Sequence, residues 1–230
     1  MKNKKVFVVS LGGSVIYPDT LDAKFIRQFY SFTLKAIKNG FKFVIITGGG
    51  KLCRLYQNTA SHIARASNSD LDWLGIGITK VNAFLLKALF KERVHPLLLD
   101  KKERVKSFGK FPLIIGCGWE PGWSTDYIAV QTAIDFKIGT VINLGKPHYV
   151  YTANPDKDPS AKPLSKLTWQ DYFEIIPKKW APGLNTPFDP VASRLAQKHN
   201  VTVIVADGRN LPNFQKIISG KKFKGTILNN

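Results

Sequence analysis

Cysteine is scarce in this sequence, with Cys53 and Cys117 as the two in 230 residues. Two thiols cannot build a disulfide framework or a four-thiolate zinc site, which excludes both kinds of stapled domain. Buried thiols in a reducing compartment are the simplest interpretation. Long apolar runs are also missing, and we expect no membrane span because no stretch comes near the roughly 20 apolar residues that one requires.

The amino terminus superficially resembles a secretory signal, because lysines precede the apolar run from Val6 to Val9. Gly12 and Gly13 interrupt that run, Asp19 follows early, and no small-residue cleavage site is present. We therefore expect a cytoplasmic protein without a membrane partner.

Acidic residues are few: 16 Asp and Glu stand against 34 Lys and Arg, giving a formal net charge of +18. Such a field attracts polyanions, including nucleotides, nucleic acids and acidic surfaces. The lysines are spread along the chain and do not gather into one arm. A generally basic protein accounts for the charge at least as well, and a nucleic-acid partner is not expected.

Strand-like and helix-like segments alternate along the whole chain, without a repeat or an obvious linker, which predicts one α/β domain over residues 1–230. Nearly continuous apolar runs typical of buried strands are Val6–Leu11, Phe41–Thr47, Val94–Leu99, Phe111–Cys117, Thr140–Leu144 and Val201–Ala206. Helical spacing is found over 52–63, 78–89, 128–136 and 195–198. Two Pro-rich stretches, Asn154 to Pro163 and Pro177 to Pro190, are interpreted as long functional loops.

Glycine-rich turns follow the first two predicted strands, as Gly12–Ser14 and as Gly48–Lys51. Ligands of a parallel sheet bind beyond the carboxyl ends of its strands. Glycine lets the backbone approach a bound group, and a following helix offers free N–H groups at its positive end. With Lys51 and Arg54 nearby, the pattern predicts a phosphate cradle. Its spacing is neither that of a P-loop nor that of a dinucleotide fingerprint.

Two further strand ends carry carboxylates. Ser124 or Thr125 is expected to cap a helix whose first turn holds Asp126, and that carboxylate could also orient lysines or magnesium. Trp119 and Trp123, in the loop before it, could stack on a base or simply pack. Asp189 and Pro190 have the form of an N-cap followed by proline, and Arg194 lies further along that helix.

These motifs stand in a characteristic order. They are Leu11–Ser14, Thr47–Lys51, Gly75–Ala83, Ser124–Asp126, Val150–Pro155 with Lys157–Pro159, and Asp189-Pro190 with Arg194. In order and spacing the chain resembles the amino acid kinase superfamily, and within it the archaeal-type uridylate kinases, from Val6 to Ile227.

The resemblance implies a three-layer αβα sandwich on a largely parallel, roughly eight-stranded sheet. It also implies transfer of the ATP γ-phosphate to UMP with Mg²⁺ present, in a homo-oligomer that is commonly a hexamer.

By the same resemblance, the residues at the transferred phosphoryl group are Asp126, Asp189, Arg194 and Lys51. Those at ATP are Gly13, Ser14, Gly50, Arg54, Tyr151 and Asn154. Those at UMP are Gly49, Asp72, Gly118, Trp119, Glu120, Pro121, Gly122, Trp123 and Ser124. Asp72 is expected to accept hydrogen bonds from the ribose, and no protein ligand of magnesium is assigned.

Three positions depart from the family pattern. Ser10 stands where many members carry lysine, and Arg194 stands where lysine is usual, which keeps the charge but changes its geometry. The segment 145–149 replaces a Thr-Asn-x-Asp-Gly motif on the ATP side. His148 within it is interpreted as a surface residue.

Three other functions stay open at this point. One is a kinase of the same superfamily acting on isopentenyl phosphate or an acylated amino acid. Another is a nucleotide-binding regulator without catalysis, suggested by Ser10 and by segment 145–149. The third is nucleic-acid binding driven by net charge.

Overall fold

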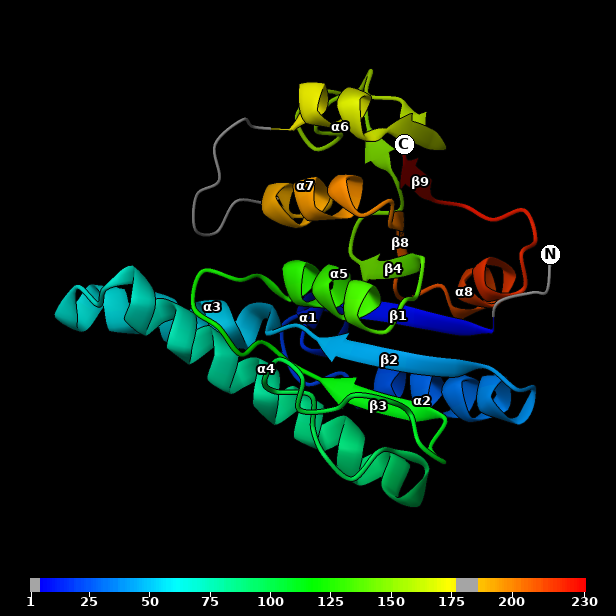
Figure 1. Ribbon diagram of the computed structural model, residues 1–230. Coiled ribbons are helices and arrows are strands. Elements are labelled where there is room, and N and C mark those ends of the chain that lie inside the picture. Colours follow the sequence, from blue (N-terminus) through cyan, green and yellow to red (C-terminus); the bar gives the residue numbers. More distant parts are fainter. Residues whose placement is uncertain (1–4, 177–185) are drawn as a thin grey trace.

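A seven-stranded sheet forms the centre of the computed structural model, which describes residues 5–176 and 186–230 (Figure 1). Its strand order is β3-β2-β1-β4-β8-β9-β7. The strands are β1 (Val6–Leu11), β2 (Lys42–Thr47), β3 (Leu113–Gly116), β4 (Thr140–Gly145), β7 (Lys166–Thr168), β8 (Thr202–Asp207) and β9 (Thr226–Asn229). The pairs from β3 to β8 are parallel, and β9 is antiparallel to β8. Two short strands, β5 (Val150–Tyr151) and β6 (Pro163–Leu164), pair separately.

Five of the six predicted strands are confirmed, and the sheet has seven strands where about eight were expected. The predicted strand Val94–Leu99 is wrong, since this segment makes only isolated bridges from Val94 to Leu113 and from Leu99 to Gly116. Pro96 in its centre has no N–H to donate, and a continuous ladder therefore cannot form. Of the predicted loop Pro177 to Pro190, residues 177–185 lie outside the described part of the chain.

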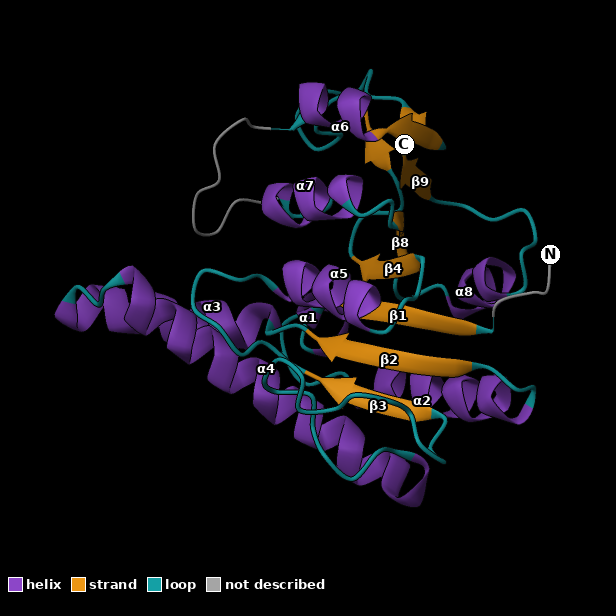
Figure 2. Ribbon diagram, in the orientation of Figure 1, coloured by secondary structure: helices purple, strands orange, loops and turns teal. Residues whose placement is uncertain are grey.

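Helices cover both faces of the sheet (Figure 2). They are α1 (Gly13–Ile16), α2 (Ala23–Lys38), α3 (Gly50–Ala64), α4 (Asn68–Phe90), α5 (Thr125–Asp135), α6 (Trp169–Ile175), α7 (Pro190–Lys198) and α8 (Leu211–Ile218), with a short 3₁₀ turn η1 (Lys91–Arg93) after α4. Sequence analysis missed α2, although Asp22 caps it by accepting from the Phe25 N–H at 2.9 Å.

The strands are apolar on both sides because each side faces a separate core. Val8, Val44 and Val141 point into the core beneath α5, α6 and α7. Their neighbours Val9 and Ile45 point into the core beneath α1, α2, α4 and α8. This double burial explains the continuous apolar runs of the sequence. Both thiols are free, with Cys117 buried and Cys53 half-buried.

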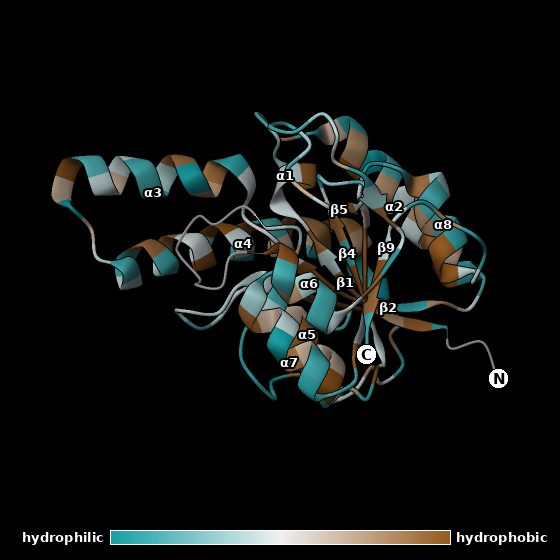
Figure 3. Cartoon of the chain, turned by 90° about the horizontal axis from the view of Figure 1, so that it is seen from above, coloured by the Kyte–Doolittle hydropathy of each residue, from teal (hydrophilic) through white to brown (hydrophobic). Residues whose placement is uncertain are grey.

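Helices α3 and α4 form a hairpin that projects from the body of the molecule (Figure 3). Its exposed large hydrophobic residues include Leu55, Ile63, Trp73, Val81 and Phe84. The stretch Asn68–Arg93 has 26 residues and is long and apolar enough to cross a membrane, by length and composition alone. This corrects the expectation that no stretch comes near that criterion. The carboxyl half of α4 also packs on the sheet through Ala83, Leu86 and Phe90, as a core helix does.

Candidate active site

The two glycine-rich turns lie against each other at the carboxyl edge of the sheet. A Cβ added to Gly13 would lie 1.9 Å from the Gly50 nitrogen, and one added to Gly48 would lie 2.4 Å from the Gly13 nitrogen. No side chain fits between backbones this close. Gly50 also has a φ of +72°, a conformation that favours glycine. The glycines therefore bring two turns together, a role that the phosphate hypothesis had not included.

Two polar side chains of helix α4 hold the backbone just after β2 and β3. Asn82 Nδ2 donates to the Gly48 carbonyl at 2.8 Å, and Thr79 Oγ1 accepts from the Gly118 N–H at 3.0 Å. Thr47 Oγ1 lies 2.9 Å from the Thr79 carbonyl oxygen. Sequence analysis missed Thr79 and Asn82 as site residues. Their signal was the presence of two polar groups on the buried face of an otherwise apolar helix.

The carboxylate of Asp126 lies at the centre of this edge, between β1 and α7. Ser10 Oγ donates to its Oδ1 at 2.8 Å, and the Asp189 N–H donates to its Oδ2 at 3.3 Å. Ser124 caps the helix that carries it, accepting from the Tyr127 N–H at 3.1 Å. The structure thus brings Asp126 and Asp189 together, as predicted, and adds Ser10.

Burial raises the pKa of Asp126 to about 6, and the neighbouring charge of Asp189 acts in the same direction. The Ser10 hydroxyl opposes both, because a donated hydrogen bond favours the charged form. Raised carboxyl pKa values of this kind are concentrated at functional sites.

Asp189 is held by its own helix, and the preceding residue Phe188 is held by a buried tyrosine. Its Oδ1 accepts from the Ala192 N–H at 2.7 Å, which confirms the predicted N-cap before Pro190. Tyr172, a residue not predicted for the site, donates its hydroxyl to the Phe188 carbonyl at 2.7 Å and accepts from the Phe188 N–H. Arg194 lies exposed further along α7.

The predicted acceptor loop, residues 118–124, is fastened to α4 by Asp72. The Asp72 Oδ2 accepts from the Gly122 N–H at 2.7 Å, so the carboxylate predicted to bind ribose holds the loop in this structure. Trp119 is 8% exposed and belongs to the core. Trp123 packs on Tyr127 with ring centroids 4.7 Å apart. For both tryptophans the structure gives the packing alternative.

Lys51, predicted at the transferred phosphoryl group, and the predicted ATP residues Arg54, Tyr151 and Asn154 come from different elements. Lys51, exposed on the first turn of α3, pairs with Asp19 at 2.5 Å, and Arg54 lies exposed near it. Tyr151 lies on β5, which follows β4, and Asn154 lies in the next loop. His148 is exposed beside Asp207 at 3.4 Å, as expected of a surface residue.

The oxygen donors at this edge suit a hard cation. Within the described ranges no group of three or more His, Cys, Asp or Glu side chains could hold a metal by itself. Asp126 and Asp189 offer carboxylate oxygens, and Mg²⁺ commonly combines one or two carboxylates with water and substrate phosphates. The residues therefore fit a magnesium ion that is brought in mainly by phosphate.

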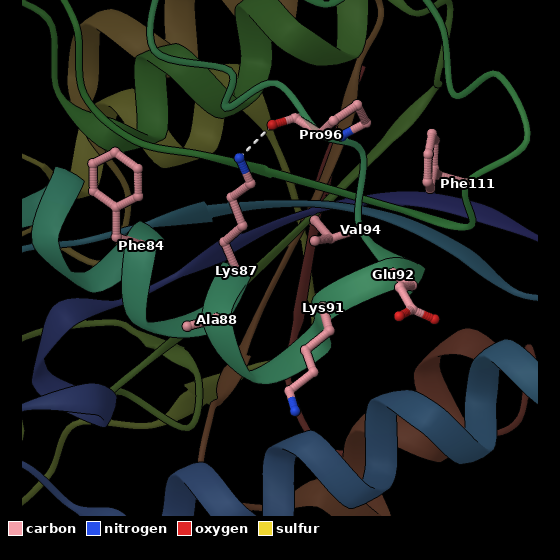
Figure 4. Close-up of a pocket in the computed structure, with 8 residues that line it drawn as sticks. All are labelled: Phe84, Lys87, Ala88, Lys91, Glu92, Val94, Pro96 and Phe111. Atoms are coloured by element: carbon pink, nitrogen blue, oxygen red, sulfur yellow. Dashed lines mark hydrogen bonds between the residues drawn. The ribbon is translucent and has the colours of Figure 1, made fainter.

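A pocket of about 640 Å³ lies away from the glycine turns (Figure 4). It is lined by Phe84, Lys87, Ala88, Lys91, Glu92, Val94, Pro96 and Phe111. Lys87 crosses it and donates to the Pro96 carbonyl.

A parallel sheet with glycine turns and paired carboxylates at its carboxyl edge is the arrangement of a phosphotransfer enzyme. The chain belongs to the amino acid kinase family, whose model matches residues 5–207. It is 30% identical to a uridylate kinase of Methanocorpusculum labreanum over 97% of this chain and 95% of that protein. It is also 30% identical to a uridylate kinase of Pyrococcus abyssi, over 96% and 98%.

Solved structures agree with this assignment. The crystal structure of uridylate kinase from Archaeoglobus fulgidus superposes with a TM-score of 0.82 at 27% identity, covering 96% of this chain and 99% of that one. UMP kinase from Bacillus anthracis, at 20% identity and a TM-score of 0.79, shares the fold. The family resemblance inferred from the motifs is confirmed.

Proposed function

We propose that this protein transfers the γ-phosphate of ATP to UMP, giving ADP and UDP, as a single catalytic domain in the cytoplasm. The observation that carries the proposal is the meeting of both glycine turns with Asp126 and Asp189 at one edge. The near full-length similarity to uridylate kinases supports UMP as the acceptor.

The strand order supports a division of the site into donor and acceptor sides. Along the edge the strands run β3-β2-β1-β4. Apart from Gly49, which lies in the turn after β2, the proposed UMP residues follow β3 or lie on α4, and the proposed ATP residues Tyr151 and Asn154 follow β4. The glycine turns of β1 and β2 lie between them, where the two substrates would meet end to end.

Phosphoryl transfer asks mainly for in-line positioning and for compensation of developing charge, without a covalent nucleophile. On this proposal Gly13, Ser14 and Gly50 present backbone to the ATP phosphates, and Arg54 adds positive charge. Gly49 and residues 118–124 bound the UMP side, together with Asp72.

At the transferred group, Asp126 and Asp189 orient the cationic partners of the phosphates, and Lys51 and Arg194 contribute positive charge. Magnesium, when bound with ATP, supplies further compensation of the phosphate charges. Ser10 and the Asp189 N–H hold the Asp126 carboxylate in one orientation before substrate arrives.

The test is ADP release with magnesium and ATP, measured across UMP, CMP, isopentenyl phosphate and N-acetylglutamate. We expect turnover with UMP. Turnover of another acceptor without turnover of UMP would overturn the proposed substrate. Nucleotide binding without any ADP release would overturn catalysis.

We also propose that the protein is a homo-oligomer, as the family resemblance implies. Helix α3 buries no residue of its own, and Leu55 and Ile63 on it are 58% and 82% exposed. A second copy covering this face would remove that apolar surface from water. Light scattering on Ile63→Glu against the unmodified protein tests this, and an unchanged mass with both as monomers would contradict it.

A further inference from the structure

The amino-terminal edge of the sheet, opposite the candidate active site, carries a row of lysines. Five strands share one direction, so their first residues lie along one edge. In Figure 1 the strands β1, β2 and β3 begin at the right. A lysine stands at the start of each strand or a few residues before it. In the sheet order β3-β2-β1-β4-β8 these residues, called here the basic row, are Lys110, Lys42, Lys5, Lys137 and Lys198.

The charges of the basic row are not neutralised by neighbours. Within residues 5–176 and 186–230, none of the five lysines forms an ion pair. Four are exposed and Lys42 is partly buried. Three ammonium groups stand over phenylalanine rings: Lys5 over Phe41 at 5.7 Å, Lys42 over Phe108 at 5.5 Å and Lys110 over Phe111 at 5.7 Å. A ring holds an ammonium group in place and leaves its charge available to an anion.

The neighbouring helices extend this positive surface. Helix α2 ends at the same edge, where it leads into β2, and its last turn carries the exposed Lys35 and Lys38. Helix α8 packs against α2 through Phe32 and Phe214, with ring centroids 4.8 Å apart. Neither helix contains an acidic residue.

A pocket of about 560 Å³ opens within the basic row. It is lined by Val6, Lys42, Lys106, Ser107, Phe108, Asp135, Phe136, Lys137 and Ile138. The rings of Phe108 and Phe136 meet edge to face at 5.8 Å. Asp135 is the acidic member of the lining, and its Oδ1 accepts from Gln131 Nε2 at 2.8 Å. The pocket combines cations with an aromatic wall and is large enough for a nucleobase.

We propose that the basic row is a binding surface for single-stranded RNA, with phosphates along the lysines and one base in the pocket against Phe108. Neighbouring strands lie about 4.8 Å apart, so the cations form an extended line that suits a chain of phosphates better than one phosphate. The aromatic wall favours a nucleobase over a lipid headgroup, since sequence-tolerant stacking on such rings is how single strands are held.

The experiment is fluorescence anisotropy of a labelled oligoadenylate of about 12 nucleotides, a length within known single-strand site sizes. Excess UMP and ADP keep it out of the substrate sites. If all five lysines contact phosphates, the logarithm of affinity falls with a slope of about −3.5 against the logarithm of salt. Affinity then drops about a hundredfold between roughly 50 and 200 mM salt.

The decisive comparison uses two triple variants of equal net charge. Lys110→Gln, Lys137→Gln and Lys198→Gln together remove three contacts, and we expect the salt slope to fall to about −1.4. The control replaces the exposed Lys157, Lys162 and Lys166, outside this edge, by Gln. It should keep the original slope. Phe108→Leu should weaken binding about fivefold or more through lost stacking.

Equal loss of binding in both triple variants would overturn the proposal, because net charge alone would then be responsible. Absence of binding at low salt would also overturn it. So would row-dependent binding to phosphatidylserine vesicles without binding to the oligonucleotide, which would indicate a membrane partner. Phosphorylation of UMP is measured on every variant, and we expect the row variant to keep it, so failure here is distinguishable from failure of the proposed function.

Discussion

The hydroxyl of Ser10 donates a hydrogen bond to Asp126 across 116 residues of sequence, at 2.8 Å. It joins the end of β1 to the first turn of α5 at the centre of the proposed transfer site. A neutral hydroxyl donor thus orients this carboxylate.

Ser10→Ala is expected to raise the pKa of Asp126 further, because the hydrogen bond from Ser10 stabilises the charged carboxylate and the variant lacks that bond. The acid limb of the pH–rate profile should therefore move upward by about one pH unit. Ser10→Thr keeps a hydroxyl and should keep the limb in place. A profile that does not move in Ser10→Ala would show that the contact has no influence on catalysis.

Asp126→Asn is expected to stabilise the fold at neutral pH while lowering kcat. The pKa of Asp126 is raised to about 6 from 3.8, so its contribution to the free energy of unfolding falls as pH rises between these values. The variant should gain about 1–2 kcal/mol at neutral pH and nothing below about pH 4. Urea denaturation at both pH values, beside the ADP-release assay, measures this. Destabilisation at neutral pH would contradict it.

Gly13→Ala is expected to be severely destabilising, because its Cβ would lie 1.9 Å from the Gly50 nitrogen. We expect a loss of about 4 kcal/mol or failure to fold. The matched control is Gly77→Ala on α4, where an added Cβ meets nothing within 4 Å. That change should stabilise the helix by up to about 1 kcal/mol. Thermal denaturation compares the two, and equal stability would refute the packing argument.

Asp72→Ala is expected to raise the KM for UMP by about tenfold or more, with little change in the KM for ATP. It removes both the proposed ribose acceptor and the bond that fastens Gly122. Asp70→Ala, two residues away, breaks the capping box with Ser67 and should cost only about 1 kcal/mol of stability. If Asp72→Ala raised the KM for ATP as much as the KM for UMP, the role of Asp72 in binding UMP would be contradicted.

Much of the fold could be predicted because its signals are local. Apolar runs marked five strands, and Asp189 before Pro190 correctly marked the start of α7. The failures are local as well. Pro96 breaks the predicted strand Val94–Leu99, although most of that segment is apolar. Helix α2 was missed, although its Asp22 cap and the helical spacing of its apolar residues were present in the sequence. The long apolar stretch Asn68–Arg93 was overlooked because Asp72, Lys80 and Lys87 interrupt it, so it does not read as one continuous apolar run.

The site was only partly predictable. Glycine turns and the Asp126 and Asp189 carboxylates were found because each follows a strand or caps a helix. Thr79 and Asn82 were not found, because their roles depend on the tertiary contacts of α4 with Gly118 and Gly48. A buried polar residue shows in the sequence that it needs a partner, but it does not show which one.

By itself the sequence determined five strands of the sheet, the caps of α5 and α7 and the family, since these depend on neighbouring residues and on their order. Only the tertiary structure decided that Ser10 meets Asp126 and that Asp72 meets Gly122. It also gathered lysines that are scattered along the chain into one row, because parallel strands bring their first residues to a common edge however far apart they lie in sequence.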